Sequence, residues 1–275
     1  MTNEIYPCLW FDGQAKEAAV FYCSVFDNSK VMMETPMMVG FELNGKKLMG
    51  LNGGPQYKIN PSISMFVHCT STEECERIWN SLSEDALVLM QLNNYPWSEK
   101  YGWLQDKFGF TWQIMKSDKD RMMPAMLFTG ANFGRAKEAM DYYTKVFAKS
   151  RIDRVNYYPE GSGFDGKVTY SEIMLDDYPL VVMDGPNEHK FTFSEGVSLV
   201  VHCANQEEID YFWNDFTKDG GEESRCGWCK DKFGVSWQII PTNLGEILGN
   251  SQNGQRAFNA MLQMKKLIIN DLINA

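Results

Sequence analysis

The chain has 275 residues, of which 44% are hydrophobic, and a formal net charge of −10 at pH 7. An acidic chain without a clustered basic surface is not expected to bind nucleic acid. It contains no apolar run long enough for a transmembrane helix and no basic, apolar leader at residues 1–4, so no membrane partner is expected either. Seven cysteines, an odd number, do not suit a disulfide framework. We therefore expect a cytoplasmic protein.

The first half of the chain predicts a strand, a helix and three strands, followed by a strand, a helix and further strands. The expected helix at about residues 14–26 has apolar residues every three or four positions. Asn44-Gly45, between two alternating apolar segments, is typical of a hairpin turn. The expected strands cover residues 5–11, 30–35, 39–43, 46–51 and 63–69.

The second half predicts the same elements after a polar linker at residues 117–123. The equivalent helix is expected at about residues 135–147. After Pro241 we expect a short helix and then a longer one over residues 255–273, which would dock on the rest of the protein. The expected strands cover residues 125–129, 151–158, 167–175, 178–183 and 197–203.

Three sequence blocks of the first half return in the same order in the second half. Because the order is kept while the gaps differ, the chain is a duplicated domain of roughly 120–130 residues. We expect domains at residues 1–117 and 122–250, and a C-terminal docking helix within residues 251–275. The clearest block is Gly102-Trp103-x-x-Asp106-Lys107-Phe108-Gly109-x-x-Trp112-Gln113-Ile114, which returns as Gly227-Trp228-x-x-Asp231-Lys232-Phe233-Gly234-x-x-Trp237-Gln238-Ile239.

These repeated motifs, together with Trp10-Phe11-Asp12-Gly13-Gln14-Ala15 and Leu51-Asn52-Gly53-Gly54-Pro55, resemble the PhnB-like branch of the vicinal oxygen chelate superfamily. That superfamily includes glyoxalase I, extradiol dioxygenases and bleomycin-binding proteins. Members of the branch often carry the description 3-demethylubiquinone-9 3-methyltransferase. The resemblance implies an α+β fold of paired βαβββ modules, which form curved mixed sheets with helices on the convex face and a ligand cup on the concave face. It also implies an intrachain pseudo-dimer, and a further homodimer is left open.

The superfamily typically binds a divalent metal through His, Glu or Gln side chains on the strands of the cup. In this sequence only Gln113 and Gln238 stand where a glutamate is common, and His68 and His202 lie at the far ends of their strands. One amide and one distant imidazole do not make a site for Zn²⁺, Ni²⁺ or Fe²⁺, which need three or four converging donors. We expect no metal and no other cofactor, and the alternative is a divalent metal held by other donors.

Strand alternation gives the candidate ligand-binding residues. Alternation places Trp112 toward the helices, and it places Gln113 and its counterpart Gln238 toward the cavity. Glu172, a carboxylate on the expected cup face, is either a general base with a raised pKa or an exposed strand residue. His189, in a polar loop at residues 187–190, is expected in solvent. Trp103 and Trp228 fit either face of the sheet. The full set of candidate ligand-binding residues is Trp10, Trp103, Gln113, Glu172, Trp228 and Gln238.

Three functions remain open at this point. The first is a metal-independent small-molecule-binding protein. The second is a metal-dependent lyase, isomerase or dioxygenase of the superfamily. The third is the methyltransferase of the family description, although the sequence has no Gly-rich strand-to-helix loop of the nucleotide-binding kind. The sequence names no ligand and does not separate an enzyme from a binding protein.

Overall fold

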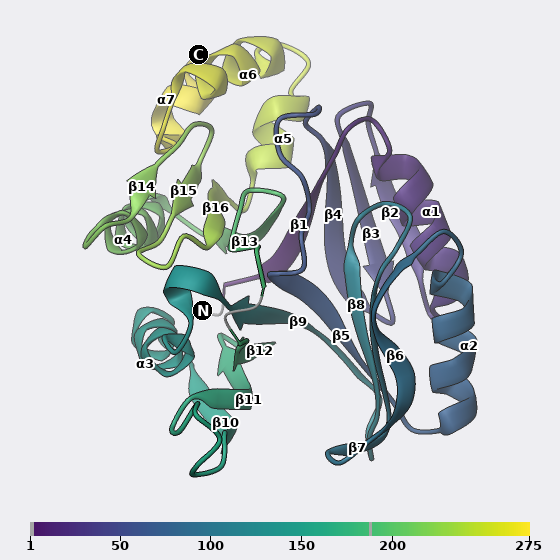
Figure 1. Ribbon diagram of the computed structural model, residues 1–275. Helices are drawn as coiled ribbons and strands as arrows, with labels where there is room; N and C mark the ends of the chain where they lie inside the picture. The colour runs from purple at the N-terminus through teal and green to yellow at the C-terminus, as the bar shows by residue number, and fades with distance from the viewer. Residues whose placement is uncertain (1–2, 187–188) are drawn as a thin grey trace.

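The computed structural model describes residues 3–186 and 189–275, which form two mixed sheets of eight strands each (Figure 1). This arrangement confirms the predicted α+β fold of curved mixed sheets. Sheet A contains, in spatial order, β14 (Glu222–Glu223), β15 (Trp228–Lys230), β16 (Ser236–Pro241), β13 (Val197–Cys203), β1 (Ile5–Phe11), β4 (Lys46–Asn52), β3 (Met38–Leu43) and β2 (Lys30–Glu34). Sheet B contains β10 (Arg151–Tyr157), β11 (Val168–Leu175), β12 (Tyr178–Asp184), β9 (Arg121–Phe128), β5 (Ile63–Cys69), β8 (Thr111–Lys116), β7 (Ser98–Gln105) and β6 (Leu87–Tyr95).

Each sheet combines half of one sequence repeat with half of the other. In sheet A, β1 of the first repeat pairs antiparallel with β13 of the second, with Cys8 opposite Ser198. In sheet B, β5 of the first repeat pairs antiparallel with β9 of the second, with Ser64 opposite Ala125. Residues from both repeats therefore line the concave face of each sheet.

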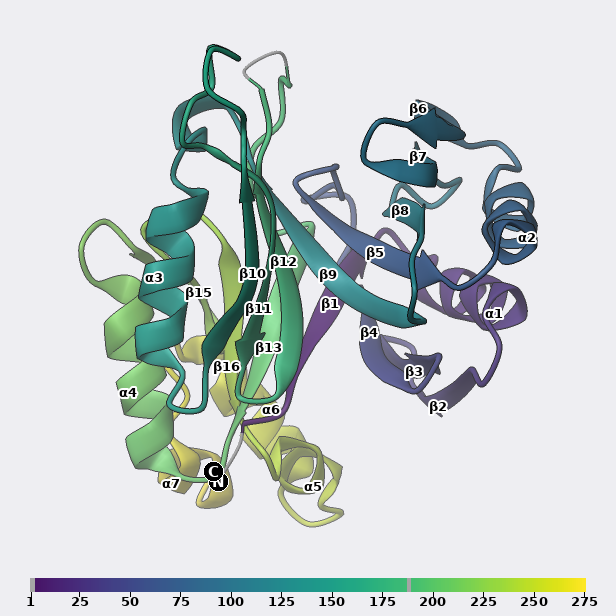
Figure 2. The same ribbon diagram turned by 90° about the horizontal axis from the view of Figure 1, so that it is seen from below.

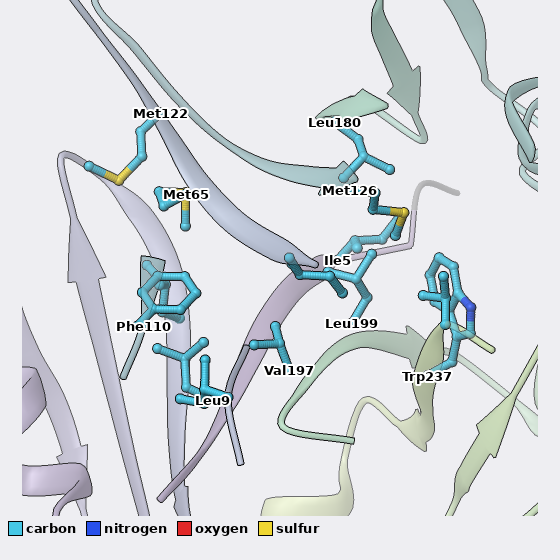
Figure 3. Packing of buried hydrophobic residues seen from close by; sticks show 14 of the residues in the cluster. Ile5, Leu9, Met65, Phe110, Met122, Met126, Leu180, Val197, Leu199 and Trp237 are labelled. Atoms are coloured by element: carbon cyan, nitrogen blue, oxygen red, sulfur yellow. The ribbon is translucent and has the colours of Figure 1, made fainter. Parts of the chain in front are cut away.

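The two sheets pack against each other through their central strands, and their concave faces open in opposite directions (Figure 2). The contact is a continuous hydrophobic core that includes Ile5 and Leu199 of sheet A and Met65 and Met126 of sheet B (Figure 3). Burial of this large apolar area is the main force that holds the sheets together. The buried indole of Trp112 belongs to the same core, as the alternation predicted.

Helices cover the convex sides of the sheets at both ends of this core (Figure 2). The apolar face of α1 turns Ala15, Ala18 and Tyr22 into the core. Ser71 and Asn205 cap α2 and α4 by accepting a hydrogen bond from a backbone N–H of the first turn. The covering elements are α1 (Ala15–Val25), α2 (Thr72–Leu82), the 3₁₀ turn η1 (Gly130–Asn132), α3 (Ala136–Val146) and α4 (Gln206–Thr217).

The structure corrects two expected elements. Strand β9 begins at Arg121, so the connection between β8 and β9 is limited to residues 117–120; the last three residues of the expected linker at 117–123 and the start of the expected strand at 125–129 are wrong. The expected single helix at 255–273 is two helices, because the backbone N–H groups of Cys226 and Gly227 bond to the carbonyls of Met264 and Lys265. The C-terminal elements are α5 (Leu244–Gly249), α6 (Gly254–Gln263) and α7 (Ile269–Ile273). Within the described residues, none of the helices is long and apolar enough to cross a membrane.

Candidate ligand-binding cups

The predicted site residues divide between the concave faces of the two sheets, here named the sheet A cup and the sheet B cup. In the sheet B cup, Trp103 of β7 lies directly opposite Gln113 of β8, and Glu172 of β11 lies farther across the sheet, with three strands between β11 and β8. The sheet A cup contains Trp10 of β1, Trp228 of β15 and Gln238 of β16.

The side-chain amide of Gln113 is fixed in the centre of the sheet B cup. Its Oε1 accepts a hydrogen bond from the Tyr101 hydroxyl at 2.7 Å, and its Nε2 donates to Ser64 Oγ at 2.8 Å. Burial raises the pKa of Tyr101 well above its ordinary value, so the phenol stays protonated and remains a donor. Beyond Ser64, the same row of the floor continues with the hydrocarbon side chains of Ala125 and Val181.

The row ends at Glu172, which lies opposite Val181 and forms an ion pair with Arg121. The two terminal nitrogens of Arg121 bind the two carboxylate oxygens of Glu172 at 2.5 and 3.0 Å, and the Tyr170 hydroxyl donates to the same carboxylate at 2.8 Å. Burial of Glu172 favours a higher pKa, but the hydrogen bonds from Arg121 and Tyr170 outweigh it and hold the pKa below its usual value. Of the two alternatives that the sequence left open for Glu172, the general base with a raised pKa is wrong, and the side chain, at 12% exposure, is not an exposed strand residue either.

His68 is the next polar group of the sheet B cup. It lies opposite Arg121 in the strand pairing, and its Nε2 is 3.4 Å from the Tyr170 hydroxyl. Burial, aided by the nearby positive charge of Arg121, lowers the pKa of His68 to about 4, so the imidazole is neutral at pH 7.

Three polar atoms of the sheet B cup are buried without a hydrogen-bond partner: His68 Nδ1, Trp103 Nε1 and Arg121 Nε. His68 and Trp103 are only 3% and 6% exposed. A buried polar group without a partner costs about 1–3 kcal/mol, and native proteins rarely leave one unused. Among the described residues, no side chain of the sheet A floor has such an atom.

Aromatic and apolar side chains surround these polar groups. Phe66, Tyr101, Trp103, Met123 and Val181 form one buried cluster that is separate from the core beneath the helices. His189, expected in solvent, instead lies with its ring centroid 5.8 Å from that of Trp103. Its loop neighbours at 187–188 lie outside the described residues.

A cavity of about 570 Å³ lies at one end of the sheet B cup. It is bounded by the β6–β7 hairpin on one side and by β10 on the other. A volume of this size is within the range of small-molecule sites. Its lining residues are Thr70, Trp97, Glu99, Met115, Lys116, Ser117, Asp118 and Arg154.

The sheet A cup repeats the central amide in different surroundings. Gln238 Nε2 donates to Ser198 Oγ at 2.9 Å, and Trp10 and Trp228 meet edge to face with ring centroids 5.8 Å apart. Cys8 stands where the sheet B cup has Ala125, and burial raises the pKa of this thiol to about 12.

The polar cluster of the sheet B cup has no equivalent in the sheet A cup. By strand register, Gly40 occupies the position of Glu172, and Glu4 that of Arg121. His202 is retained, but its Nε2 is 2.8 Å from the Tyr6 hydroxyl, so its environment differs from that of His68.

C-terminal helices lie at the opening of the sheet A cup. Figures 1 and 2 show α5 between the two walls of sheet A. The apolar cluster of these helices, including Ile247 and Leu267, packs against Ile240, which also contacts the floor of the cup. The chain's own C-terminal segment thus covers this face.

Sequence reasoning did not find Tyr101, Arg121 and Tyr170. Arg121 was assigned to the linker, whereas it is the first residue of β9. A usable signal existed for Tyr170, because it is two residues from Glu172 on the same strand and therefore shares its face. Among the described residues, no group of three or more His, Cys, Asp and Glu side chains is arranged to hold a metal ion.

The chain is similar to several proteins of known structure. Glyoxalase I from Zea mays shares the fold, with a TM-score of 0.57 and 11% sequence identity over 91% of this chain and 98% of that chain. A putative 3-demethylubiquinone-9 3-methyltransferase, PhnB protein, from Bacillus cereus is 33% identical over 40% of this chain and 96% of that chain, with a TM-score of 0.38. Protein PA1353 from Pseudomonas aeruginosa is 24% identical over 41% of this chain and 96% of that chain, with a TM-score of 0.37.

A search of the curated proteins gives no match. The family model described as 3-demethylubiquinone-9 3-methyltransferase matches the chain twice, at residues 3–115 and 120–240. Through both of its repeats, the chain belongs to this PhnB-like family and has a duplicated vicinal oxygen chelate fold.

Proposed function

We propose that the protein binds a small organic molecule in the sheet B cup and that it does so without a metal ion. The observation that carries this proposal is the presence of three unpartnered buried polar atoms, on His68, Trp103 and Arg121, in one apolar concave face. A ligand that hydrogen-bonds to these atoms would remove their desolvation cost, which gives the cup a specific reason to bind.

The side chains around the central amide support binding without metal. Beside Gln113 the floor carries the hydroxyl of Ser64 and then the hydrocarbon groups of Ala125 and Val181. Both polar groups of the Gln113 amide are already hydrogen-bonded within the protein. A first-row divalent ion prefers several imidazole, carboxylate or thiolate donors, whereas this row offers one carboxylate, Glu172, whose two oxygens are bound by Arg121.

The state of Glu172 supports binding rather than general-base catalysis. A general base works best when its pKa is near the working pH, whereas the pKa of Glu172 is held low by two hydrogen-bonding partners. Its carboxylate also has both oxygens engaged by Arg121. Glu172 therefore serves to orient Arg121 in the cup. We place this activity in the cytoplasm, because the seven cysteines are unsuited to a disulfide framework.

Native mass spectrometry of the untagged protein, purified without added metal, tests the proposal. We expect a chain mass without a stoichiometric divalent ion, and we expect chelator treatment to leave the binding of a small aromatic ligand unchanged. One tightly held ion per chain, together with loss of ligand binding after chelation, would refute metal-independent binding. An organic adduct that His68→Gln or Trp103→Phe removes would support it and identify the ligand.

A further inference from the structure

The charges of the sheet B floor cancel. Arg121 and Glu172 form a bidentate pair, so their opposite charges neutralise each other. His68 is uncharged at neutral pH because burial and Arg121 lower its pKa to about 4. An ionic ligand between these groups would lose its hydration beside charges that are already paired. The guanidinium of Arg154, 5.8 Å from the Tyr170 ring centroid, lies on the edge strand β10 and belongs to the lining of the cavity.

The charged side chains that line the cavity at one end of the cup also sum to zero. The cavity of about 570 Å³ is lined by two cations, Lys116 and Arg154, and by two carboxylates, Glu99 and Asp118. Lys116 and Glu99 already form an ion pair with each other. The cavity lining therefore has no excess charge that would concentrate either anions or cations.

Two of the unpartnered atoms are donors only. The indole Nε1–H of Trp103 and the guanidinium Nε–H of Arg121 cannot accept a hydrogen bond in any protonation state found in proteins. Arg121 has this donor left because its bidentate contact with Glu172 uses the two terminal nitrogens. The complementary ligand groups are acceptors such as carbonyl or ether oxygens.

The walls favour a flat, apolar body. Phe66, Tyr101 and Met123 belong to the buried apolar cluster of the cup. Trp97, which lines the cavity, stacks on Tyr95 with ring centroids 4.9 Å apart. Aromatic surfaces of this kind gain most from contact with another ring.

From these observations we infer that the sheet B cup selects neutral, largely aromatic molecules that carry oxygen acceptors, and that it discriminates against organic anions and cations of the same shape. This inference rests on the proposed function of the cup, and it adds the chemical class of the ligand.

Four probes with one ring system test the inference: 1-indanone, indane, indane-1-carboxylate and 1-aminoindane. They supply a neutral acceptor, no acceptor, an anion and a cation on the same frame. Affinities are measured by NMR titration against the full chain, Trp103→Phe and Trp228→Phe. Trp103→Phe removes the donor and keeps an aromatic ring, and Trp228→Phe is the matched change in the sheet A cup.

We expect 1-indanone to bind about tenfold more tightly than each of the other three probes, since one neutral hydrogen bond contributes about that factor. Trp103→Phe is expected to remove most of this preference over indane, and Trp228→Phe to leave it unchanged. Intermolecular NOEs from 1-indanone to the methyl groups of Met115 and Met123 in the unmodified protein locate the probe independently of any effect on folding.

The outcomes separate the two proposals. Suppose that indane-1-carboxylate or 1-aminoindane binds as tightly as 1-indanone and that Trp103→Phe weakens this binding. The cup then binds ligands, but the inference that it selects neutral ligands is wrong. If indane binds as tightly as 1-indanone, the requirement for an acceptor is wrong. If all four probes fail to bind, or if only Trp228→Phe affects binding, the sheet B cup is not the binding site and both proposals fall.

Discussion

The indole Nε1 of Trp237 donates a hydrogen bond to Oδ2 of Asp231 at 2.9 Å, in a part of the core where both side chains are buried. Tyr143 donates to the same oxygen at 2.7 Å, and two backbone N–H groups of the following turn donate to Oδ1. Asp106 and Trp112 repeat the contact in the first half at 2.7 Å. The repeated motif Gly-Trp-x-x-Asp-Lys-Phe-Gly-x-x-Trp-Gln-Ile therefore has a structural role, because its aspartate shapes the turn and fixes its second tryptophan.

Asp231→Asn should destabilise the protein without changing ligand binding in the sheet B cup. The amide nitrogen of asparagine would face two donors, Tyr143 and Trp237, and leave both without an acceptor. We expect a loss of about 2–4 kcal/mol in the free energy of unfolding, measured by urea denaturation. Tyr143→Phe, which removes one donor and leaves none unsatisfied, should cost about 1 kcal/mol. Equal losses for the two variants would contradict this account.

The ion pair of Arg121 and Glu172 should show a measurable coupling energy. The side chain of Glu172 is 12% exposed and that of Arg121 is 40% exposed, so solvent screens part of the attraction. A double-mutant cycle with Arg121→Met and Glu172→Gln is expected to give about 1 kcal/mol in the free energy of unfolding.

The exposed pair of Lys16 and Glu34 is the matched control for this cycle. Its N–O distance is 2.8 Å, but the two side chains are 62% and 46% exposed. The equivalent cycle with Lys16→Met and Glu34→Gln should give less than about 0.5 kcal/mol. A coupling energy of the Arg121 pair no larger than that of the control would show that the cup does not fix the pair.

His68 should make the protein less stable as the pH falls from 7 to 5. The pKa of His68 is about 4 in the folded protein, against the ordinary value of 6.5 expected in the unfolded chain. As the pH falls, the unfolded chain therefore takes up a proton before the folded protein does. The expected loss is about 2 kcal/mol between pH 7 and pH 5. This contribution of His68 should be absent in His68→Gln. His202, whose pKa is also lowered, contributes equally to the pH dependence of both proteins. Urea denaturation at the two pH values measures the difference, and parallel pH dependences would refute the assignment.

Leu267 should hold the C-terminal segment on the rest of the protein. Its side chain is fully buried, and the carbonyls of Met264 and Lys265 just before it accept hydrogen bonds from Cys226 and Gly227. Leu267→Ala should lower the free energy of unfolding by about 2–4 kcal/mol and accelerate hydrogen exchange of the Cys226 and Gly227 amides. Leu262, which is 40% exposed, is the control, and Leu262→Ala should cost under about 0.5 kcal/mol. Similar effects of the two changes would mean that the segment is not anchored at Leu267.

Local pattern predicted which face a side chain takes, because alternation depends only on neighbours in sequence. Gln113 and Trp112 lie on opposite faces of β8 for this reason. The partner of a side chain depends on which strands become neighbours, and that is not a local property. Arg121 reaches Glu172 from 51 residues away, across β12.

The start of β9 was misplaced because Arg121 and the residues before it are polar. A closer comparison of the repeats would have helped, since Pro124 stands opposite Met65 in sheet B as Pro7 stands opposite Leu199 in sheet A. The break between α6 and α7 had no local signal. It arises from hydrogen bonds that Met264 and Lys265 make to a distant loop, which override the helical pattern.

Each sheet is built from half of one repeat and half of the other, and this arrangement affects how the two cups can change during evolution. In a symmetric pair of identical subunits, every substitution would appear in both cups at once. Here the two cups draw on different stretches of one gene product, so each can change alone. The contrast between Glu172 and Gly40, and between Arg121 and Glu4, is what that independence produces. Tandem duplication thus gave one molecule two inherited copies of a site and the freedom to keep them different.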